Sequence, residues 1–347
     1  MMENLIDRFG EGPLMLAIGA LVGLIFGAAA YHSRFCLRAA TAEVAEGRFA
    51  DRMAIWLITF STALLSVQLS ITTGLLDVSE ARQLAATGSL SGAIIGGLLF
   101  GCGMVLARGC ASRLLILSAS GNLRALTTGL VLTLTAQAAL RGGLSPLRET
   151  LFSLWTVEGG APRHLLDLLG LNRWAFVALA AAVLAIGITH GLRHRVRKTE
   201  LLAAATVGLA ICLGWLLTYH LATASFEVIS IQSVTFTGPS TDTLMAFINQ
   251  PQVAPDFGIG LVPGVFVGAF LAAFLQGELK IQRFGNDIPM ERYILGGMLM
   301  GFGSMLAGGC AVGAGVTGGA ILALTAWVAI FCMWLGALAT QFLLRQP

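Results

Sequence analysis

Two Gly-Cys pairs stand 200 residues apart in this chain of 347 residues, at positions 109–110 and 309–310. Each pair follows a long apolar run, and its neighbouring glycines favour a break in a helix. A half-helix that begins at such a break directs the positive end of its dipole at the break, which favours an anion. A cysteine adds a small, soft S–H donor that does not repel an anion while burial keeps the thiol neutral. The pairs therefore predict a site for an anion that is contacted by Gly109, Cys110, Gly309 and Cys310.

Arginines add positive charge around the first pair only. Arg108 and Arg113 flank Cys110, whereas glycines stand at the equivalent positions around Cys310. A third cysteine lies between two arginines in the sequence His-Ser-Arg-Phe-Cys-Leu-Arg, and these neighbours favour thiolate character more than those of the other two. The candidate site residues are therefore Arg34, Cys36, Arg108, Gly109, Cys110, Arg113, Gly309 and Cys310.

These residues also have structural explanations. A cysteine in a membrane helix commonly serves as a small apolar filler, which is the favoured interpretation of Cys102, Cys212 and Cys332. Arg34, Arg38 and Arg113 are equally consistent with anchoring to lipid head groups. The chain has no Cys-x-x-Cys motif, so the sequence predicts no zinc site, redox pair or cofactor.

The two Gly-Cys pairs belong to a duplicated segment. Residues 95–112 and 295–312 align without a gap, and ten of the 18 positions are identical. A second echo, Gln-Ala-Ala-Leu-Arg at 137–141 and Gln-Phe-Leu-Leu-Arg at 341–345, follows at nearly the same offset. In a hydrophobic chain, such duplication is typical of transporters.

The composition places these segments in a membrane. Hydrophobic residues make up 56% of the chain and charged residues 11%, whereas a soluble domain has about 25% charged residues. The net charge of +3 is spread among loops, which gives no stripe for a nucleic acid. At about 20 residues per crossing, the apolar runs predict nine spans, of which the third and eighth are interrupted at the Gly-Cys pairs: 14–36, 53–76, 91–120, 125–140, 174–192, 201–221, 259–279, 293–320 and 321–344.

The lysines and arginines of the loops predict the orientation. The loop at 193–198 holds four of them and is expected in the cytoplasm, whereas 222–258 holds none and is expected outside. This choice places the N-terminus outside and the C-terminus in the cytoplasm. The loop at 141–172 disagrees with this orientation, because it carries three arginines and would lie outside. We let the loop at 193–198 determine the orientation, since its positive charges are more closely spaced.

With nine spans, the two duplicated segments cross the membrane in opposite senses. We therefore expect an all-α integral membrane protein with an inverted 4+1+4 repeat, in which the broken helices meet at mid-membrane. The first repeat would occupy 1–140, a connecting loop and central span 141–199, and the second repeat 200–347.

Three motifs carry a resemblance to a known family. Ser-Arg-Phe-Cys at 33–36, GCGMVLARGCAS at 101–112 and GFGSMLAGGCAVGAG at 301–315 resemble the YeeE/YedE family of sulphur transport proteins. The resemblance implies transport of thiosulfate across the bacterial inner membrane by a relay of three thiols, which by motif position are Cys36, Cys110 and Cys310. It also implies a cytosolic partner, a TusA-like sulphur-carrier protein. Some relatives are tied to selenium metabolism.

The resulting hypothesis is an importer of thiosulfate or a related sulphur oxyanion, and not an enzyme. One alternative is a membrane sulphur-transfer or selenium-metabolism component that forms a persulfide on Cys36. Another is a channel for neutral sulphide. The lack of a catalytic base beside Cys110 or Cys310 favours transport. The sequence contains no ATP-binding motif or obvious sodium site that would indicate the energy source.

Overall fold

Membrane-spanning helices dominate the computed structural model, which describes residues 2–170, 172–249, 253–283 and 289–345. Within these residues, nine helices or broken helices are long and apolar enough to cross a membrane: Glu11–Ala45, Asp51–Thr72, Leu90–Ala119, Leu123–Arg141, Arg173–Arg193, Lys198–Ala224, Phe257–Leu275, Met290–Ala320 and Leu324–Leu344. The predicted spans agree with these bounds to within four residues, except that the first continues to Ala45 instead of ending at Cys36. The prediction of an all-helical, multi-pass membrane protein is confirmed.

The described elements follow one another in this order: α1 (Met2–Phe9), α2 (Glu11–His32), α3 (Leu37–Ala45), α4 (Asp51–Thr72), α5 (Arg82–Ala85), β1 (Gly88–Ser89), α6 (Leu90–Leu106), α7 (Ala111–Ala119), α8 (Leu123–Arg141), α9 (Ser145–Ser153), β2 (Thr156–Val157), the 3₁₀ turn η1 (Ala161–Arg163), α10 (Leu165–Leu169), α11 (Arg173–Arg193), α12 (Lys198–Ala224), α13 (Thr237–Asn249), α14 (Phe257–Leu275), α15 (Met290–Ala307), the π-helix η2 (Ala311–Thr317), α16 (Gly318–Ala320) and α17 (Leu324–Arg345). The two short strands pair antiparallel and tie the start of α6 to the segment after α9.

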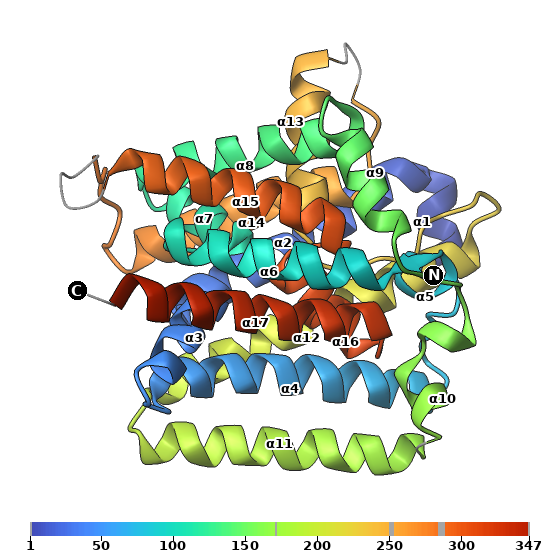
Figure 1. Cartoon of the computed structure of the whole chain (residues 1–347). Helices are drawn as coiled ribbons and strands as arrows, with labels where there is room; N and C mark the ends of the chain where they lie inside the picture. Colours follow the sequence, from blue (N-terminus) through green and yellow to red (C-terminus); the bar gives the residue numbers. More distant parts are fainter. Residues whose placement is uncertain (1, 171, 250–252, 284–288, 346–347) are drawn as a thin grey trace.

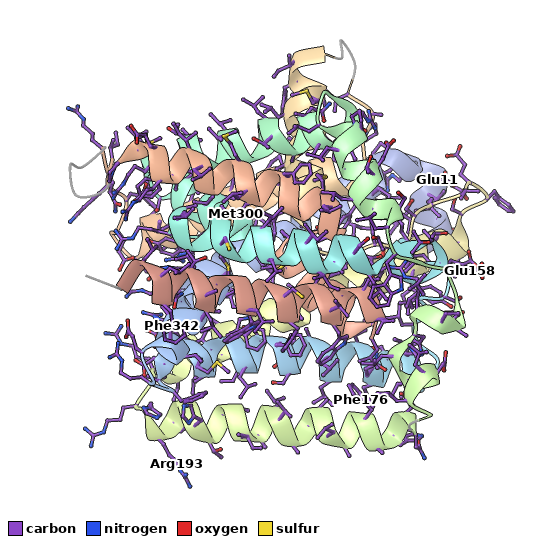
Figure 2. The ribbon with its side chains drawn as sticks, in the orientation of Figure 1. Glu11, Glu158, Phe176, Arg193, Met300 and Phe342 are labelled. Atoms are coloured by element: carbon purple, nitrogen blue, oxygen red, sulfur yellow. The ribbon has the colours of Figure 1, made fainter. Side chains whose placement is uncertain are left out.

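The long helices run side by side between two ends of the molecule (Figure 1). The start of α15 and the end of α17 lie at one end, and α1, α5 and α10 lie at the other. Figure 2 places Arg193 and Phe342 at the first end and Glu11 and Glu158 at the second. Helix α11 lies at the edge of the bundle, where it packs mainly on α4.

Glycines bring the central helices into backbone contact. A Cβ placed at Gly23 of α2 would lie 2.4 Å from the carbonyl oxygen of Leu261 in α14, and one at Gly264 would lie 2.4 Å from that of Ala20. Small residues permit such close packing where lipid provides no hydrophobic driving force between helices. Because both helices contribute glycines, α2 and α14 form a tight central pair.

Helices α6 and α15 pack in the same manner. A Cβ at Gly96 would lie 2.5 Å from the carbonyl oxygen of Gly303, and one at Gly103 would lie 2.6 Å from that of Gly296. The contact numbers run in opposite directions along the two helices, so α6 and α15 are antiparallel. Each helix ends at one of the Gly-Cys pairs, which confirms that both spans are interrupted there.

The 222–258 segment contains more structure than the sequence analysis expected of a polar loop. It carries the helix α13, and Val234 and Phe236, just before that helix, are buried. The Thr317 hydroxyl of η2 donates a hydrogen bond to the Val234 carbonyl oxygen at 2.6 Å. The segment therefore enters the bundle and packs against the second broken helix.

Candidate functional site

All three cysteines of interest occupy the same position in a broken helix. The residue two places before each cysteine has a positive φ: 53° at Arg34, 56° at Arg108 and 81° at Gly308. Glycine adopts this left-handed conformation readily, whereas it costs an ordinary L-residue about 1–2 kcal/mol. The two arginines therefore occupy positions that would suit glycine better for the backbone alone.

Hydrogen bonds explain why each helix stops there. The N–H group just before each cysteine bonds to a carbonyl oxygen five residues back: Phe35 to Ala30 at 3.2 Å, Gly109 to Met104 at 3.1 Å and Gly309 to Ser304 at 2.8 Å. This is the Schellman ending, which requires a left-handed residue at the position before. Each preceding helix therefore ends with its last carbonyl groups satisfied.

A new helix begins at each cysteine. Cys36, Cys110 and Cys310 are the N-cap residues of α3, α7 and η2. Their carbonyl oxygens accept the first hydrogen bonds of those helices, from Ala40, Leu114 and Ala314. Each thiol thus lies at the positive end of a half-helix, as predicted for Cys110 and Cys310. The third break, at Cys36, lacks a glycine and was not predicted from the sequence.

The structure brings two of the three thiols together. Cys36 and Cys110 are buried, and their side chains lie near each other. The Cys110 Sγ also lies 3.3 Å from the hydroxyl of Ser112. The guanidinium of Arg113 is near both thiols. Cys36, Cys110 and Arg113 therefore form one cluster, which combines soft donors with a positive charge.

Cys310 occupies a separate, closed environment. It is 1% exposed, and its Sγ accepts a hydrogen bond from the Gly313 N–H at 3.4 Å. The Thr235 side chain lies so close to Gly313 that a Cβ there would come within 2.1 Å of its hydroxyl oxygen. Neither Cys310 nor Gly309 lines the cavity described next.

A cavity of about 570 Å³ opens over Cys36. Helix ends and loops that are far apart in the sequence form its walls, and six cationic side chains line it: Arg34, Arg38, Arg52, Arg108, Arg113 and Lys280. Glu278 is the one carboxylate among its lining residues. Such an excess of positive charge in a concave, low-dielectric site attracts anions.

Two of these arginines have buried nitrogens that lack a hydrogen-bond partner among the described residues, namely Nη1 of Arg113 and Nε of Arg38. Leaving a buried charged donor unsatisfied costs several kcal/mol, so native structures rarely do so without a ligand or water. An anion beside either side chain would supply the missing acceptors. These two nitrogens therefore indicate where an anion would bind.

Glu278 holds part of the cavity mouth in place. Its Oε2 accepts a hydrogen bond from the Tyr31 hydroxyl at 2.8 Å, and its Oε1 lies 3.7 Å from Nη2 of Arg34. Both charged side chains are about half exposed, so this ion pair contributes little to stability. Glu278 thus places a negative charge where a bound anion would compete with it.

Sequence reasoning missed part of this cavity. Arg52, Glu278 and Lys280 come from segments that carry no motif, and the backbone pairing of Leu123 with Gln282 holds the last two near the end of α7. The available signal was topological, because the predicted spans place Arg52, before the second span, and Lys280, after the seventh, at the same membrane face. Of the predicted residues, Arg34, Cys36, Arg108 and Arg113 line the cavity, while Cys110 and Gly109 are buried beside it.

The other cysteines have packing contacts. The Cys212 Sγ lies 3.7 Å from the Ser70 hydroxyl, and Cys102 donates to the Gly336 carbonyl oxygen at 3.5 Å. Cys332 lies against Gly97. These contacts agree with the interpretation of the three residues as fillers and make them useful controls.

The sequence profile of the sulphur transport family matches residues 32–339. The chain belongs to this sulphur transport family. The match covers all three breaks and all six cationic residues of the cavity. It confirms the resemblance on which the sequence analysis relied, and it identifies the chain as a transporter rather than an enzyme.

Two curated relatives of this family member are similar along nearly their whole length. The thiosulfate transporter TsuA of Spirochaeta thermophila is 32% identical over 337 residues, which cover 93% of this chain and 97% of that protein. The thiosulfate transporter TsuA of Escherichia coli is 26% identical over 355 residues, which cover 95% and 94%. The similarity therefore extends over most of the chain.

Proposed function

We propose that this sulphur transport family member carries thiosulfate, or a related sulphur oxyanion, across the bacterial inner membrane. The names of the two relatives support the choice of substrate. The observation that carries the proposal is the Nη1 of Arg113, which has no hydrogen-bond partner among the described residues and lies beside the Cys36 and Cys110 thiols. Thiosulfate combines negative charge with a terminal sulphur, so it matches a cation placed next to soft donors.

The proposed mechanism is a relay of neutral thiols. Cys310, Cys110 and Cys36 would donate hydrogen bonds to the ion in turn, each worth about 1.5–3 kcal/mol because the acceptor is charged. The N-termini of η2, α7 and α3 would add favourable dipoles at the same points. Thiols suit a relay because, unlike a buried guanidinium, they do not hold the anion by charge.

The predicted glycines and arginines would have separate roles in transport. Gly109 and Gly309 would let the backbone and the ion approach closely at the breaks. Arg34, Arg108 and Arg113 would draw the ion from the thiols into the cavity, where six cations share its charge. The equivalent of Arg108 in the second duplicated segment is Gly308, which carries no charge. The transported anion would therefore be attracted more strongly beside the cavity than beside Cys310.

An inverted repeat would explain how two similar breaks face opposite sides of the membrane. The reciprocal contacts of Gly96 with Gly303 and of Gly103 with Gly296 support this arrangement. We retain the repeat bounds 1–140 and 200–347, with 141–199 between them. The broken helices α6–α7 and α15–η2 would then place Cys110 and Cys310 along one path near the middle of the membrane.

The cavity would open to the cytoplasm, because the loop at 193–198 lies at the same end of the bundle and is rich in arginine. Import would therefore run from Cys310 towards Cys36. A TusA-like sulphur-carrier protein would receive thiosulfate at this mouth, and the exposed part of the cationic lining would suit an acidic surface on it.

Uptake into liposomes tests the proposal. The purified protein is reconstituted and supplied with radiolabelled thiosulfate outside the vesicles. We expect saturable uptake that unlabelled thiosulfate inhibits, whereas protein-free liposomes take up none. Uptake equal to that of the protein-free liposomes would contradict the transport of thiosulfate.

The competing persulfide hypothesis needs its own measurement, because Cys36 lines the cavity together with the arginines that would bind thiosulfate. The protein is incubated with labelled thiosulfate and its cysteines are assayed for persulfide. We expect none during uptake. A persulfide that forms on Cys36 as fast as thiosulfate disappears would favour the sulphur-transfer function instead.

A further inference from the structure

A second, smaller hollow adjoins the cationic cavity. It has a volume of about 200 Å³ and lies over the end of α6, between the start of α15, the end of α17 and the helix α3. Arg38 and Arg108 line both hollows, whereas Arg292 lines only the second. Three guanidinium groups therefore meet at this hollow: Arg38 of α3, Arg108 at the break after α6, and Arg292 of α15, which has no part in the transport mechanism.

The charge of this hollow favours an anion. Its one carboxylate lining residue, Glu46, is already engaged in an ion pair with Arg48. The buried Nε of Arg38 has no hydrogen-bond partner among the described residues. Arg38 and Arg292 likewise make no ion pair within the described part of the chain. A phosphate group would supply acceptors to all three guanidinium groups.

Its apolar walls distinguish this hollow from the larger cavity. Val105, Leu106 and Leu344 line it beside the arginines. The helices on either side of it also present apolar side chains outward, with Leu295 of α15 51% exposed and Phe342 of α17 56% exposed. Figure 2 shows Phe342 at the end of the bundle where the loop at 193–198 also lies. A ligand with a charged head and apolar chains fits this combination, whereas a free ion would leave the apolar walls uncovered.

We infer that this hollow binds the phosphate of an anionic phospholipid, whose acyl chains lie along the outward faces of α15 and α17. Basic pockets between spanning helices at the cytoplasmic face are a recognised setting for such headgroups. Because the lipid shares Arg38 and Arg108 with the transport cavity, it would also fix these two side chains at the cavity wall. The inference does not depend on which anion the protein transports.

Lipid retention tests the site separately from transport. The full chain is purified in detergent with phosphatidylglycerol or phosphatidylcholine and analysed by native mass spectrometry. We expect wild type to retain phosphatidylglycerol in preference to phosphatidylcholine. Arg292→Ala should weaken this retention about tenfold, since it removes one charge-assisted contact. Arg52→Ala is the matched control, because Arg52 lines only the transport cavity, and it should retain phosphatidylglycerol as wild type does.

Two further measurements test whether the charge of Arg292 is what retains the lipid and whether the bound phosphate belongs to a lipid or to a free ion. Arg292→Lys keeps the charge and should retain most of the phosphatidylglycerol. Millimolar inorganic phosphate should fail to displace the lipid. The inference is overturned if Arg292→Ala retains phosphatidylglycerol as well as wild type, if Arg292→Lys is as defective as Arg292→Ala, or if inorganic phosphate displaces the lipid, which would identify a free-anion site.

Discussion

Cysteine is an unusual choice for the first position of a helix. Serine, threonine, asparagine and aspartate are the side chains that stabilise an N-cap best. The chain nevertheless places cysteine at the N-caps of α3, α7 and η2, although other helices use ordinary caps, such as Asn122 for α8 and Asp256 for α14. Helix stability alone would favour serine at these three sites. Contact of the thiols with the transported ion, as proposed above, would explain the choice of cysteine.

Substituting the cap cysteines separates the two explanations. We expect Cys110→Ala and Cys310→Ala each to slow thiosulfate uptake about 10- to 150-fold, because one hydrogen bond to the ion is lost at the barrier. Cys36→Ala should impair uptake as well. Cys110→Ser should unfold no more readily than wild type and still lose most transport, since its hydroxyl is harder and more hydrated than a thiol. Initial uptake rates and thermal unfolding measure the two effects.

Cys212→Ala and Cys332→Ala serve as controls, because these cysteines have only packing contacts, and they should transport at nearly the wild-type rate. Wild-type rates in both serine variants at 110 and 310 would show that any donor suffices. Wild-type uptake rates in Cys110→Ala and Cys310→Ala would show that these two cysteines only fill space in the packing.

The carboxylate of Glu278 should lower the affinity of the cavity for an anion. Glu278→Gln keeps an acceptor for the Tyr31 hydroxyl but frees Arg34 from its partner at 3.7 Å. Exposed pairs are worth about 0.2–1 kcal/mol, so we expect thiosulfate to bind up to about fivefold more tightly. Calorimetric titration of the purified protein measures this change. Glu200→Gln, outside the cavity, should leave thiosulfate binding unchanged. Weaker thiosulfate binding in Glu278→Gln would contradict the idea that the Glu278 carboxylate competes with the anion for Arg34.

At the scale of the helices, the breaks depend on close crossings that hold each half-helix in place. The crossing of α6 and α15 has backbone contacts at Gly96 and Gly303 that leave no room for a Cβ. Helix α6 ends about one turn after Gly103, and α15 ends about one turn after Gly303. A Gly-Cys pair follows the end of each helix. The positions of Cys110 and Cys310 are thus set by the packing of α6 against α15.

Gly303→Val tests this dependence. Its side chain would meet the backbone of α6, with a Cβ 2.7 Å from the Gly96 carbonyl oxygen, so the helices must separate. Overpacking of this kind costs about 1–3 kcal/mol or more, and we expect a lower unfolding temperature together with slower uptake. Gly129→Val is the matched control, because no heavy atom lies within 4 Å of a Cβ there. Equal unfolding temperatures for the two variants would show that the crossing is not tight.

The sequence predicted those elements that have a local cause. Apolar length defines the nine spans, and the glycines at 308 and 309 mark the second break without any knowledge of the fold. The break before Cys36 escaped prediction because Arg34 adopts the left-handed conformation that normally indicates glycine. Helix α13 escaped because its segment is polar and proline-containing, and because it packs on α14 and on α8, which is distant in the sequence.

The cavity could be predicted only in part for a different reason. Cys36 and Arg113 stand beside motifs, but Glu278 and Lys280 reach the site through the fold of a loop after α14. No spacing in the sequence relates these two residues to Cys36. Their positions depend on the pairing of α2 with α14, which brings Tyr31 and Glu278 within hydrogen-bonding distance. Long-range packing, rather than local pattern, therefore completes the site.

At the scale of the whole molecule, the two ends differ in charge. The loop at 193–198, the start of α4 and the segment after α14 bring arginines and lysines to the end where the cavity opens. The segment between α12 and α13 contains no lysine or arginine and lies beyond the opposite end of α12. Under the positive-inside rule, this asymmetry supports the proposal that the cavity faces the cytoplasm.

Accessible cysteines introduced at the two ends of α12 test this orientation. Arg197 and Val228 are exposed and flank a helix of 27 residues, about 40 Å long, so they should lie on opposite sides of the membrane. A membrane-impermeant maleimide should label Val228→Cys in intact cells but should label Arg197→Cys only after permeabilisation. The wild-type chain is the control, since Cys36, Cys110, Cys212, Cys310 and Cys332 are buried and Cys102 is partly buried within the bundle. If Arg197→Cys were labelled in intact cells and Val228→Cys were protected, the cavity would face outward and the direction proposed for the relay would be reversed.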